Sequence, residues 1–310
     1  MRVVFMGTPD FAVGTLEAII KEGYEVAGVV TQPDKPKGRG KNMQFTPVKE
    51  VAVAKNIPVY QPIRVKEPEF IEELQKLNPE VIVVVAFGQI LPKAILDMPQ
   101  YGCVNVHASL LPRYRGAAPI QWAVIDGEKE SGVTTMLMEE GLDTGDMLKK
   151  TVVPLEEDET GGSLHDKLAA AGADLLIETL KELEAGTSVR TKQDDTLSNY
   201  AKMLDKQLGH IDFTKPAEEI ERLIRGLNPW PSAFTGIDGK TLKIWSATVV
   251  NQEAEGKYGE IVEVTQDSIL VKTGKGLLEL DEVQLEGKKR METDAFLRGY
   301  PVKVGTILSK

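Results

Sequence analysis

The sequence predicts an α/β fold, in which a doubly wound, mostly parallel sheet is followed by a small domain of short strands. Three observations carry this prediction. Apolar runs alternate with amphipathic segments over the first half of the chain. The run at 80–88 is apolar throughout, as expected of a strand that is covered on both faces. After about residue 238, short strand-like runs follow one another with Gly or polar turns between them.

The first half of the chain supplies the elements of this sheet in order. Strands are expected at RVVFMG, EVAGVVTQP, IPVYQP, EVIVVVAFG, GCVNVHAS, VTTMLME and DMLKKTVVP. Helices are expected at about 9–23, 47–56, 68–77 and 162–183, where apolar residues recur with a helical period. This alternation is typical of a Rossmann-like sheet.

The second half of the chain changes character. Residues 187–207 are polar and weakly periodic, so we expect a linker there between a first domain, 1–186, and a C-terminal domain, 208–310. A helix should open the second domain with Thr214 as its N-cap. Asp-Gly at 238–239 is expected to form a hairpin turn, and the short strands around it favour a small OB-like β-barrel.

Composition narrows the class of protein. The chain has 310 residues, of which 42% are hydrophobic and 27% charged, as in ordinary soluble proteins. The longest apolar run, at 81–87, is too short to span a bilayer. A single cysteine, Cys103, excludes an intramolecular disulfide and fits a reducing compartment, so a cytoplasmic location is expected. The expected form is a monomer.

Charge argues against a protein that binds nucleic acid over its whole surface. The net charge is −10, from 37 basic and 47 acidic side chains. The stretch DKPKGRGK at 34–41 is a local exception, with four cations and one anion. Such a segment can hold a polyanion, although basic loops are often only solvated.

The first turn does not predict a dinucleotide site. It reads GTPDFAVG and contains only Gly7 and Gly14, so the Gly-x-Gly-x-x-Gly spacing is missing. Without the middle glycine the backbone cannot approach a pyrophosphate closely, and Pro9 lacks an N–H donor. A ligand is still expected outside the carboxyl ends of the parallel strands.

Polar side chains cluster at one such strand end. Asn105 and His107 are two residues apart on a strand, so their side chains leave the same face. An amide donor and an imidazole that converge on one atom suit acyl transfer, in which an oxygen becomes negative in a tetrahedral intermediate. The turn GLDTGD offers Asp143 or Asp146 as the carboxylate that orients the imidazole.

Other interpretations of these residues remain open. His107 can be a hydrogen-bonded structural residue, and Asn105 can serve only to bind loop backbone. Cys103 lies on the same strand face and could be a nucleophile, although a buried structural thiol fits better because only His107 could lower its pKa. The three histidines are scattered and no CxxC or HxxxH occurs, so no metal site is expected.

At these residues the sequence resembles the folate-dependent formyltransferases. The run NVHASLLPRYRGAAPIQWAVIDGE and the turn GLDTGDML carry the resemblance, and FMGTPDFA, VVAFGQILP and IRGLNPWPSAF extend it over nearly the whole chain. GRGK and NPWP resemble the members of that family that act on tRNA.

The resemblance implies a donor, an acceptor and a set of site residues. The donor would be 10-formyltetrahydrofolate, and the acceptor the α-amine of initiator methionyl-tRNA. Catalysis would fall to Asn105, His107 and Asp143, and the folate would lie against Ser109, Leu110, Leu111 and Pro112. The basic insert, with Lys37, Arg39 and Lys41, would reach the acceptor end of the tRNA, which the C-terminal domain would also hold.

Several related functions share the same catalytic core. Relatives that formylate an amino sugar nucleotide or hydrolyse formyltetrahydrofolate also carry a second domain, whereas one that formylates a purine precursor would be shorter. A noncatalytic RNA-binding protein is a further alternative, which the acidic composition and the complete Asn/His/Asp set disfavour. The basic insert and NPWP favour the tRNA enzyme.

Overall fold

The protein divides into two compact units. The computed structural model describes residues 1–37 and 42–309. Unit 1 comprises residues 1–119, 130–154 and 165–201, and unit 2 comprises 120–129, 155–164 and 202–310. Because the short segments 120–129 and 155–164 are counted in unit 2, each unit is discontinuous in sequence.

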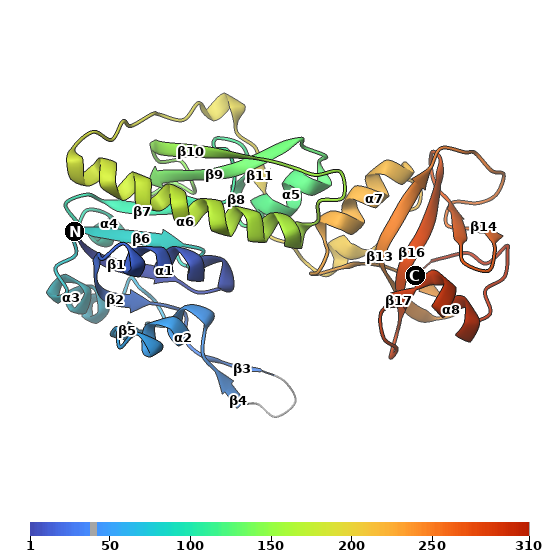
Figure 1. The fold of residues 1–310 in the computed structure, drawn as a ribbon, viewed down its shortest axis with the longest axis horizontal. Helices are drawn as coiled ribbons and strands as arrows, with labels where there is room; N and C mark the ends of the chain where they lie inside the picture. The colour runs from blue at the N-terminus through green and yellow to red at the C-terminus, as the bar shows by residue number, and fades with distance from the viewer. Residues whose placement is uncertain (38–41, 310) are drawn as a thin grey trace. The chain divides into compact units, whose positions relative to one another are not determined.

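Unit 1 is built on one seven-stranded sheet with the strand order β10-β9-β7-β6-β1-β2-β5 (Figure 1). The strands are β1 (Arg2–Gly7), β2 (Glu25–Val30), β5 (Val59–Tyr60), β6 (Val81–Val85), β7 (Cys103–His107), β9 (Glu130–Leu137) and β10 (Met147–Pro154). β7, β6, β1, β2 and β5 are mutually parallel, while β9 and β10 add an antiparallel edge. The mostly parallel, Rossmann-like sheet predicted from the sequence is confirmed.

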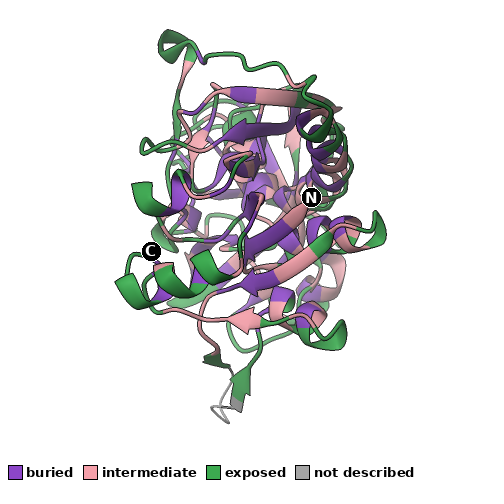
Figure 2. Cartoon of the chain, turned by 90° about the vertical axis from the view of Figure 1, so that its left-hand side faces the viewer, coloured by how far each residue is buried: buried purple, intermediate pink, exposed green. Residues whose placement is uncertain are grey.

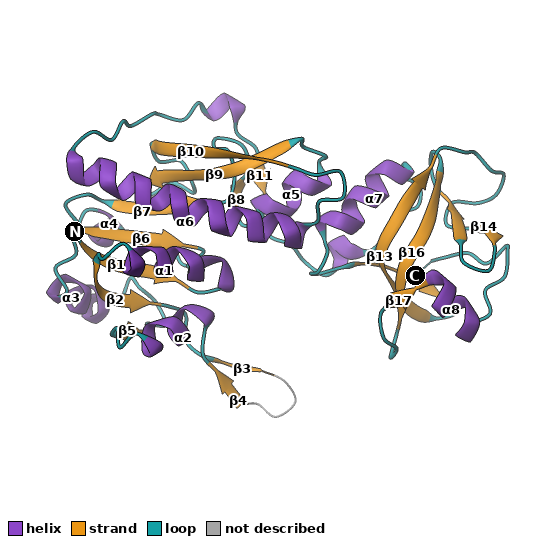
Figure 3. Cartoon of the chain, viewed as in Figure 1, coloured by secondary structure: helices purple, strands orange, loops and turns teal. Residues whose placement is uncertain are grey.

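Helices cover both faces of this sheet (Figure 3). They are α1 (Val13–Lys21), α2 (Pro47–Ala54), α3 (Pro68–Lys76), α4 (Lys93–Leu96) and most of α6 (Gly161–Ala185). Alternate residues of β7 show the two layers. Cys103 packs in a cluster with side chains of α3 and α4, whereas Val106 lies on the opposite face, against Gly172 of α6. No helix within the described residues is long and apolar enough to cross a membrane.

The core of unit 1 follows the central strands. All five residues of β6 are buried, as the continuous apolar run predicted, and Figure 2 shows buried strand segments between helices with exposed outer surfaces. Full burial on both faces is what makes this strand read as VIVVV rather than as an alternating pattern. The carboxyl end of β7, next to it, carries the candidate site.

Two small paired elements accompany the sheet. β3 (Lys35–Lys37) and β4 (Asn42–Gln44) form an antiparallel hairpin, where the sequence predicted only a basic loop. β8 (Arg115–Gly116) pairs in parallel with β11 (Tyr200–Ala201). β11 lies within 187–207, the stretch in which we expect the linker, and residues up to Ala201 belong to unit 1.

Unit 2 is dominated by an antiparallel sheet with the order β12-β13-β16-β15-β14, and β17 pairs with β16. Its strands are β12 (Ala233–Ile237), β13 (Lys240–Val250), β14 (Ile261–Val264), β15 (Ile269–Lys272), β16 (Leu277–Leu285) and β17 (Met291–Glu292), and its helices include α5 (Pro119–Ile125), α7 (Ala217–Gly226) and α8 (Thr293–Gly299). A C-terminal domain of short antiparallel strands is thereby confirmed, and its OB-like character stays a prediction.

Two local predictions in unit 2 have opposite outcomes. Asp238 and Gly239 do form the turn of the β12–β13 hairpin, with φ angles of 48° and 74°. Thr214 is not the N-cap of α7, which begins at Ala217 after Pro216. The Thr214 hydroxyl instead donates to the Asp212 carboxylate at 2.7 Å, so the threonine closes the preceding turn.

Candidate active site

The strand β7 places the first two site residues. Asn105 pairs with Val84 of β6 and with Met136 of β9, and His107 pairs with Thr134 at the end of the strand. His107 is buried, with 6% of its surface exposed, and Asn105 is half-buried. Within residues 1–37 and 42–309, no hydrogen bond engages the Asn105 amide, so this group is free to donate to a ligand.

The imidazole of His107 has an oxygen on each side. Its Nε2 donates to the carbonyl of Tyr114 at 2.9 Å, because a carbonyl can only accept. Its Nδ1 lies 3.8 Å from Oδ2 of Asp143. The ring can donate toward both oxygens only when both nitrogens carry a proton. The backbone therefore fixes the orientation of the ring through Nε2, and Nδ1 is the nitrogen that faces the carboxylate.

Asp143 reaches the ring from the turn between β9 and β10. Oδ2 of Asp143 accepts a 2.8 Å hydrogen bond from the N–H of Gly116, which fixes the carboxylate beside β8. The backbone of Asp143 has a φ of 52°, a left-handed conformation that non-glycine residues seldom adopt. Asp143 is thus the carboxylate at the ring. The backbone carbonyl of Asp146 accepts from the N–H of Leu137, so Asp146 helps to hold the turn against β9.

The loop that follows β7 is held by side chains of the antiparallel edge. The Thr134 hydroxyl donates to the carbonyl of Ser109 at 2.7 Å and accepts from the N–H of Leu111 at 3.1 Å. Lys150 Nζ donates to the carbonyl of Leu111, and burial lowers the pKa of this ammonium. The backbone of the loop is therefore fixed at several points.

Two of the predicted folate-contacting residues turn their side chains into the protein. The hydroxyl of Ser109, which is buried, donates to the carbonyl of Arg113 at 2.6 Å. The side chain of Leu111 is fully buried in a cluster with Met136 and Met147. These two residues shape the loop, so contact with a ligand would come from its backbone and from the half-buried Leu110 and Pro112.

Several groups around the site escaped the sequence analysis. The carbonyl of Tyr114 and the N–H of Gly116 are backbone groups, for which no residue type gives a signal. Asn199 accepts from the N–H of Tyr114 at 2.5 Å, and Gln193 contacts the turn of Asp143. Both residues come from a polar stretch without periodicity, so no pattern could have identified them.

The predicted tRNA contacts fall mostly beyond the described chain. Arg39 and Lys41 lie outside the described residues, and Lys37 ends β3 next to them. Asp34 and Thr46 flank the hairpin, and both are tied down. The ion pair with Lys49 lowers the pKa of Asp34, and the hydroxyls of Thr46 and Thr31 are 2.8 Å apart.

Cys103 and the metal-ligating residue types were the other candidates for chemistry in the sequence. Burial raises the pKa of the Cys103 thiol to about 12, and its Sγ lies 3.5 Å from the carbonyl of Ile95. The thiol is therefore a structural group rather than a nucleophile. Among the described residues, His, Cys, Asp and Glu form no cluster that could hold a metal ion.

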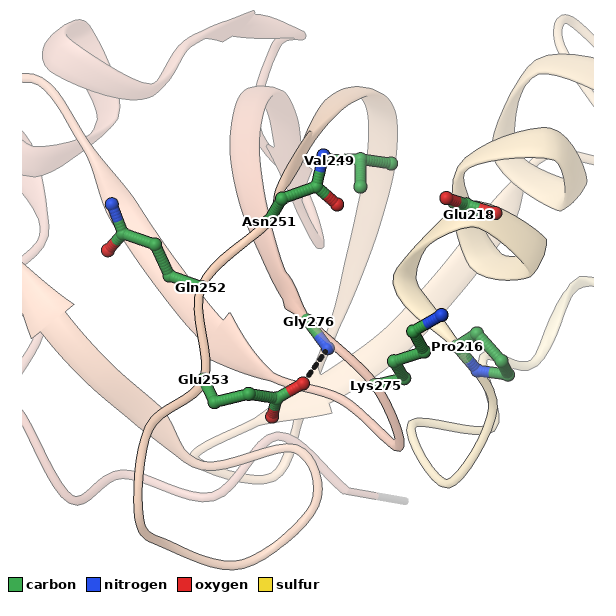
Figure 4. A pocket seen from close by; sticks show the side chains of 8 residues that line it. All are labelled: Pro216, Glu218, Val249, Asn251, Gln252, Glu253, Lys275 and Gly276. Carbon is green, nitrogen blue, oxygen red and sulfur yellow. Dashed lines mark hydrogen bonds between the residues drawn. The ribbon is translucent and has the colours of Figure 1, made fainter.

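A cavity of about 180 Å³ lies in unit 2, whereas the candidate site residues belong to unit 1 (Figure 4). Lys275 and Glu218 line it together with the amides of Asn251 and Gln252. Glu253 lines it as well, but its carboxylate accepts the N–H of Gly276 at 3.0 Å. This cavity contains none of the predicted site residues.

Comparison with known proteins identifies the family of the chain. The family described as "Formyl transferase" matches residues 1–180, and "Formyl transferase, C-terminal domain" matches residues 203–301. Two solved structures show the same fold. An N-formyltransferase from Helicobacter canadensis has a TM-score of 0.68 at 21% identity, over 93% of this chain and 99% of that one. HypX from Aquifex aeolicus has a TM-score of 0.65 at 16% identity, over 100% of this chain and 51% of that one.

The chain belongs to the formyl transferase family and is a transferase. Curated relatives place it more narrowly. A protein of Agathobacter rectalis is 61% identical over 309 residues, which cover 100% of both chains, and one of Clostridioides difficile is 52% identical over 99% of this chain and 100% of that one. Both are methionyl-tRNA formyltransferases, and this chain belongs with them.

Proposed function

We propose that this chain transfers the formyl group of 10-formyltetrahydrofolate to the α-amine of initiator methionyl-tRNA, which gives N-formylmethionyl-tRNA for translation initiation. Methionyl-tRNA formyltransferases match 99 to 100% of the chain at 50 to 61% identity. The observation that carries the chemistry is the 3.8 Å approach of the Asp143 carboxylate to Nδ1 of His107, at the end of the strand that presents Asn105.

The proposed catalytic residues are Asn105, His107 and Asp143. The neutral amine attacks the formyl carbon, and negative charge develops on the formyl oxygen. The Asn105 amide donates to that oxygen, and the charged ring of His107 stabilises the same charge. Asp143 keeps the ring charged and oriented.

The proton balance completes the reaction. As the new carbon–nitrogen bond forms, the amine loses a proton to Asp143 or to a water beside it. The bond between the formyl carbon and the folate nitrogen then breaks, and that nitrogen receives the proton. The products are the formylated amine and tetrahydrofolate, with no change of oxidation state.

The proposed folate contacts are Ser109, Leu110, Leu111 and Pro112. The loop is a suitable wall because Thr134 and Lys150 fix its backbone in front of β9 and β10. A preformed loop loses little conformational freedom when it contacts a ligand. HypX, which has this fold, is known in complex with tetrahydrofolic acid.

The proposed tRNA contacts lie in two places. Lys37 is the last residue of β3, and Arg39 and Lys41 follow it in the chain before β4. The flanks of this basic insert are held as described above. In the proposed tRNA-binding domain, residues 208–310, Trp245 is flanked by Arg290, with its guanidinium 4.7 Å from the ring centroid, and by Lys243 at 5.4 Å. Cations beside an aromatic ring suit contact with RNA phosphates and bases.

The proposal assigns 1–186 to the catalytic domain and 187–207 to the linker. We also propose that the enzyme is a monomer and that it is located in the cytoplasm. The single buried thiol of Cys103 supports the location, because it is compatible with a reducing compartment.

The experiment that tests this function is the transfer of labelled formyl from 10-formyltetrahydrofolate. Charged initiator tRNA and UDP-amino-arabinose are compared as acceptors, for the wild type and for His107→Ala. We expect transfer to the tRNA only, and a loss of about 100-fold or more in the variant. Preferential transfer to the sugar nucleotide, formate release without an acceptor, or a fully active variant would each contradict the proposal.

A further inference from the structure

The side-chain amide of Gln193 forms four hydrogen bonds beside the candidate site. This residue comes from the stretch 187–207 and is buried, with 6% of its surface exposed. Its Nε2 donates to the carbonyls of Asp143 and Gly145, both at 2.8 Å. Its Oε1 accepts from Nε and Nη2 of Arg115, at 3.1 and 2.8 Å. The amide thus uses both of its N–H donors and both lone pairs of its oxygen.

The two carbonyls belong to the turn that carries the catalytic carboxylate. Asp143 has a positive φ, a conformation that a non-glycine residue keeps only where the surroundings impose it. Gly145 is equally constrained, since a Cβ there would lie 1.7 Å from the carbonyl oxygen of Leu137. Gln193 therefore fixes the turn at the residue whose side chain faces His107.

The Arg115 guanidinium connects Gln193 to the backbone N–H of Gly116, the other group that holds the Asp143 carboxylate. Arg115 precedes Gly116, whose N–H donates to Oδ2 of Asp143. β11 lies so close to Gly116 that a Cβ there would be 2.7 Å from the carbonyl oxygen of Ala201. The Gln193 amide thus joins the two backbone elements that meet at the carboxylate.

The segment around Gln193 is itself anchored on both sides. Thr191 and Met147 exchange backbone hydrogen bonds of 2.8 and 2.9 Å at the start of β10. Further along, β11 pairs with β8. Gln193 is therefore presented from a backbone that is tied to the same two elements.

We propose that Gln193 is a positioning residue, which holds the turn of Asp143 so that the carboxylate stays directed at His107. The inference rests on the proposed role of Asp143. A residue that only stabilises the fold would change the free energy of unfolding, whereas a positioning residue changes the reaction through the carboxylate. The two roles can be separated by a double-mutant cycle.

The variant that isolates the two donors is Gln193→Glu. It keeps an oxygen for Arg115 but removes both N–H groups and sets an oxygen against the carbonyls of Asp143 and Gly145. We expect kcat to fall about 100-fold, as for a misplacement of about 1 Å at a catalytic group, while the KM for methionyl-tRNA changes less than about twofold. Gln193→Met removes all four hydrogen bonds and serves as the second variant, so that poor folding of one leaves the other to be measured.

The cycle combines each Gln193 variant with Asp143→Asn. Residues that act as a unit are not additive, so the Gln193 change should cost less than about twofold once the carboxylate is gone. Asp195→Asn is the matched control. It removes the exposed ion pair between Asp195 and Arg115 in the same segment, and it should leave kcat unchanged.

The outcomes distinguish this inference from the proposed function. An equal loss of kcat on both backgrounds, or a Gln193→Glu enzyme with the wild-type kcat, overturns the positioning role alone. An Asp143→Asn enzyme with the wild-type rate, or a wild type that formylates no methionyl-tRNA, overturns the proposed function and this inference with it. Thermal melts of every variant show that rates are compared between folded chains.

Discussion

His107 donates from Nε2 to the carbonyl of Tyr114, so a backbone oxygen rather than a side chain holds the far edge of the ring. Tyr114 is itself fixed, because its N–H donates to Asn199. With its other nitrogen directed at Asp143, the ring has both nitrogens turned toward protein oxygens. The amide of Asn105 is then the side-chain donor best placed to meet a substrate oxygen directly.

Asn105→Ala should abolish most of the activity. Removing one donor to a developing oxyanion costs about 100- to 1000-fold in rate, and we expect a loss of that size in kcat. Single-turnover formyl transfer to methionyl-tRNA measures it. Binding of formyltetrahydrofolate should change far less, and near-wild-type turnover in a folded variant would contradict the role of Asn105.

Thr134→Val tests whether the fixed loop serves folate binding. The variant leaves the N–H of Leu111 and the carbonyl of Ser109 without their buried partner, so the free energy of unfolding should fall by about 1–3 kcal/mol. The KM for formyltetrahydrofolate should rise with it. Urea denaturation and steady-state kinetics measure the two effects.

The neighbouring threonine provides the control for Thr134→Val. Thr135 is also fully buried, but its hydroxyl pairs with that of Thr179 in α6, on the other face of the sheet. Thr135→Val should destabilise the fold and leave the KM for the folate unchanged. An equal rise in KM for both variants would mean that the loop is affected only through stability.

Cys103 should be inert toward alkylation. With its pKa raised to about 12, the thiolate fraction at pH 8 is about one part in ten thousand. Iodoacetamide should therefore leave the native enzyme active and should modify Cys103 only in denaturant. The variant Cys103→Ala should also keep its activity. Rapid inactivation that follows modification of Cys103 would revive the nucleophilic interpretation.

Arg39→Ala should separate the two substrates. A cation in the insert that contacts the tRNA contributes to the binding of that substrate alone, so formylation of methionyl-tRNA should weaken far more than folate binding. The effect should diminish as salt rises, because phosphate contacts are screened. Equal losses for both substrates would argue that the insert is structural.

The fold was predictable wherever burial leaves a pattern. The apolar run at 81–87 predicted a strand covered on both faces, and the two-residue spacing of Asn105 and His107 predicted their common face. The partner carboxylate was narrowed to Asp143 or Asp146, and the resemblance chose Asp143. In the structure, Oδ2 of Asp143 lies 3.8 Å from Nδ1 of His107, and its role in catalysis stays a prediction.

The remaining parts of the site depend on contacts between distant segments. Gln193 and Asn199 lie in polar coil, where no periodicity separates a buried amide from a solvated one. Thr214 shows the converse problem. It is a capping residue type that lies shortly before a helix, yet α7 begins only at Ala217. The Thr214 hydroxyl donates to Asp212 in the preceding turn, and this bond lowers the pKa of that carboxyl.

The contacts of residues 191–201 have a practical consequence for anyone who dissects the chain. A fragment truncated at residue 186 would lose the Gln193 amide, the Asn199 oxygen and the strand that borders Gly116. Extending the fragment to Ala201 retains all three. Cutting where the polar composition begins would therefore remove the supports of the proposed catalytic carboxylate. An inactive fragment of that length would say nothing about whether catalysis requires the C-terminal domain.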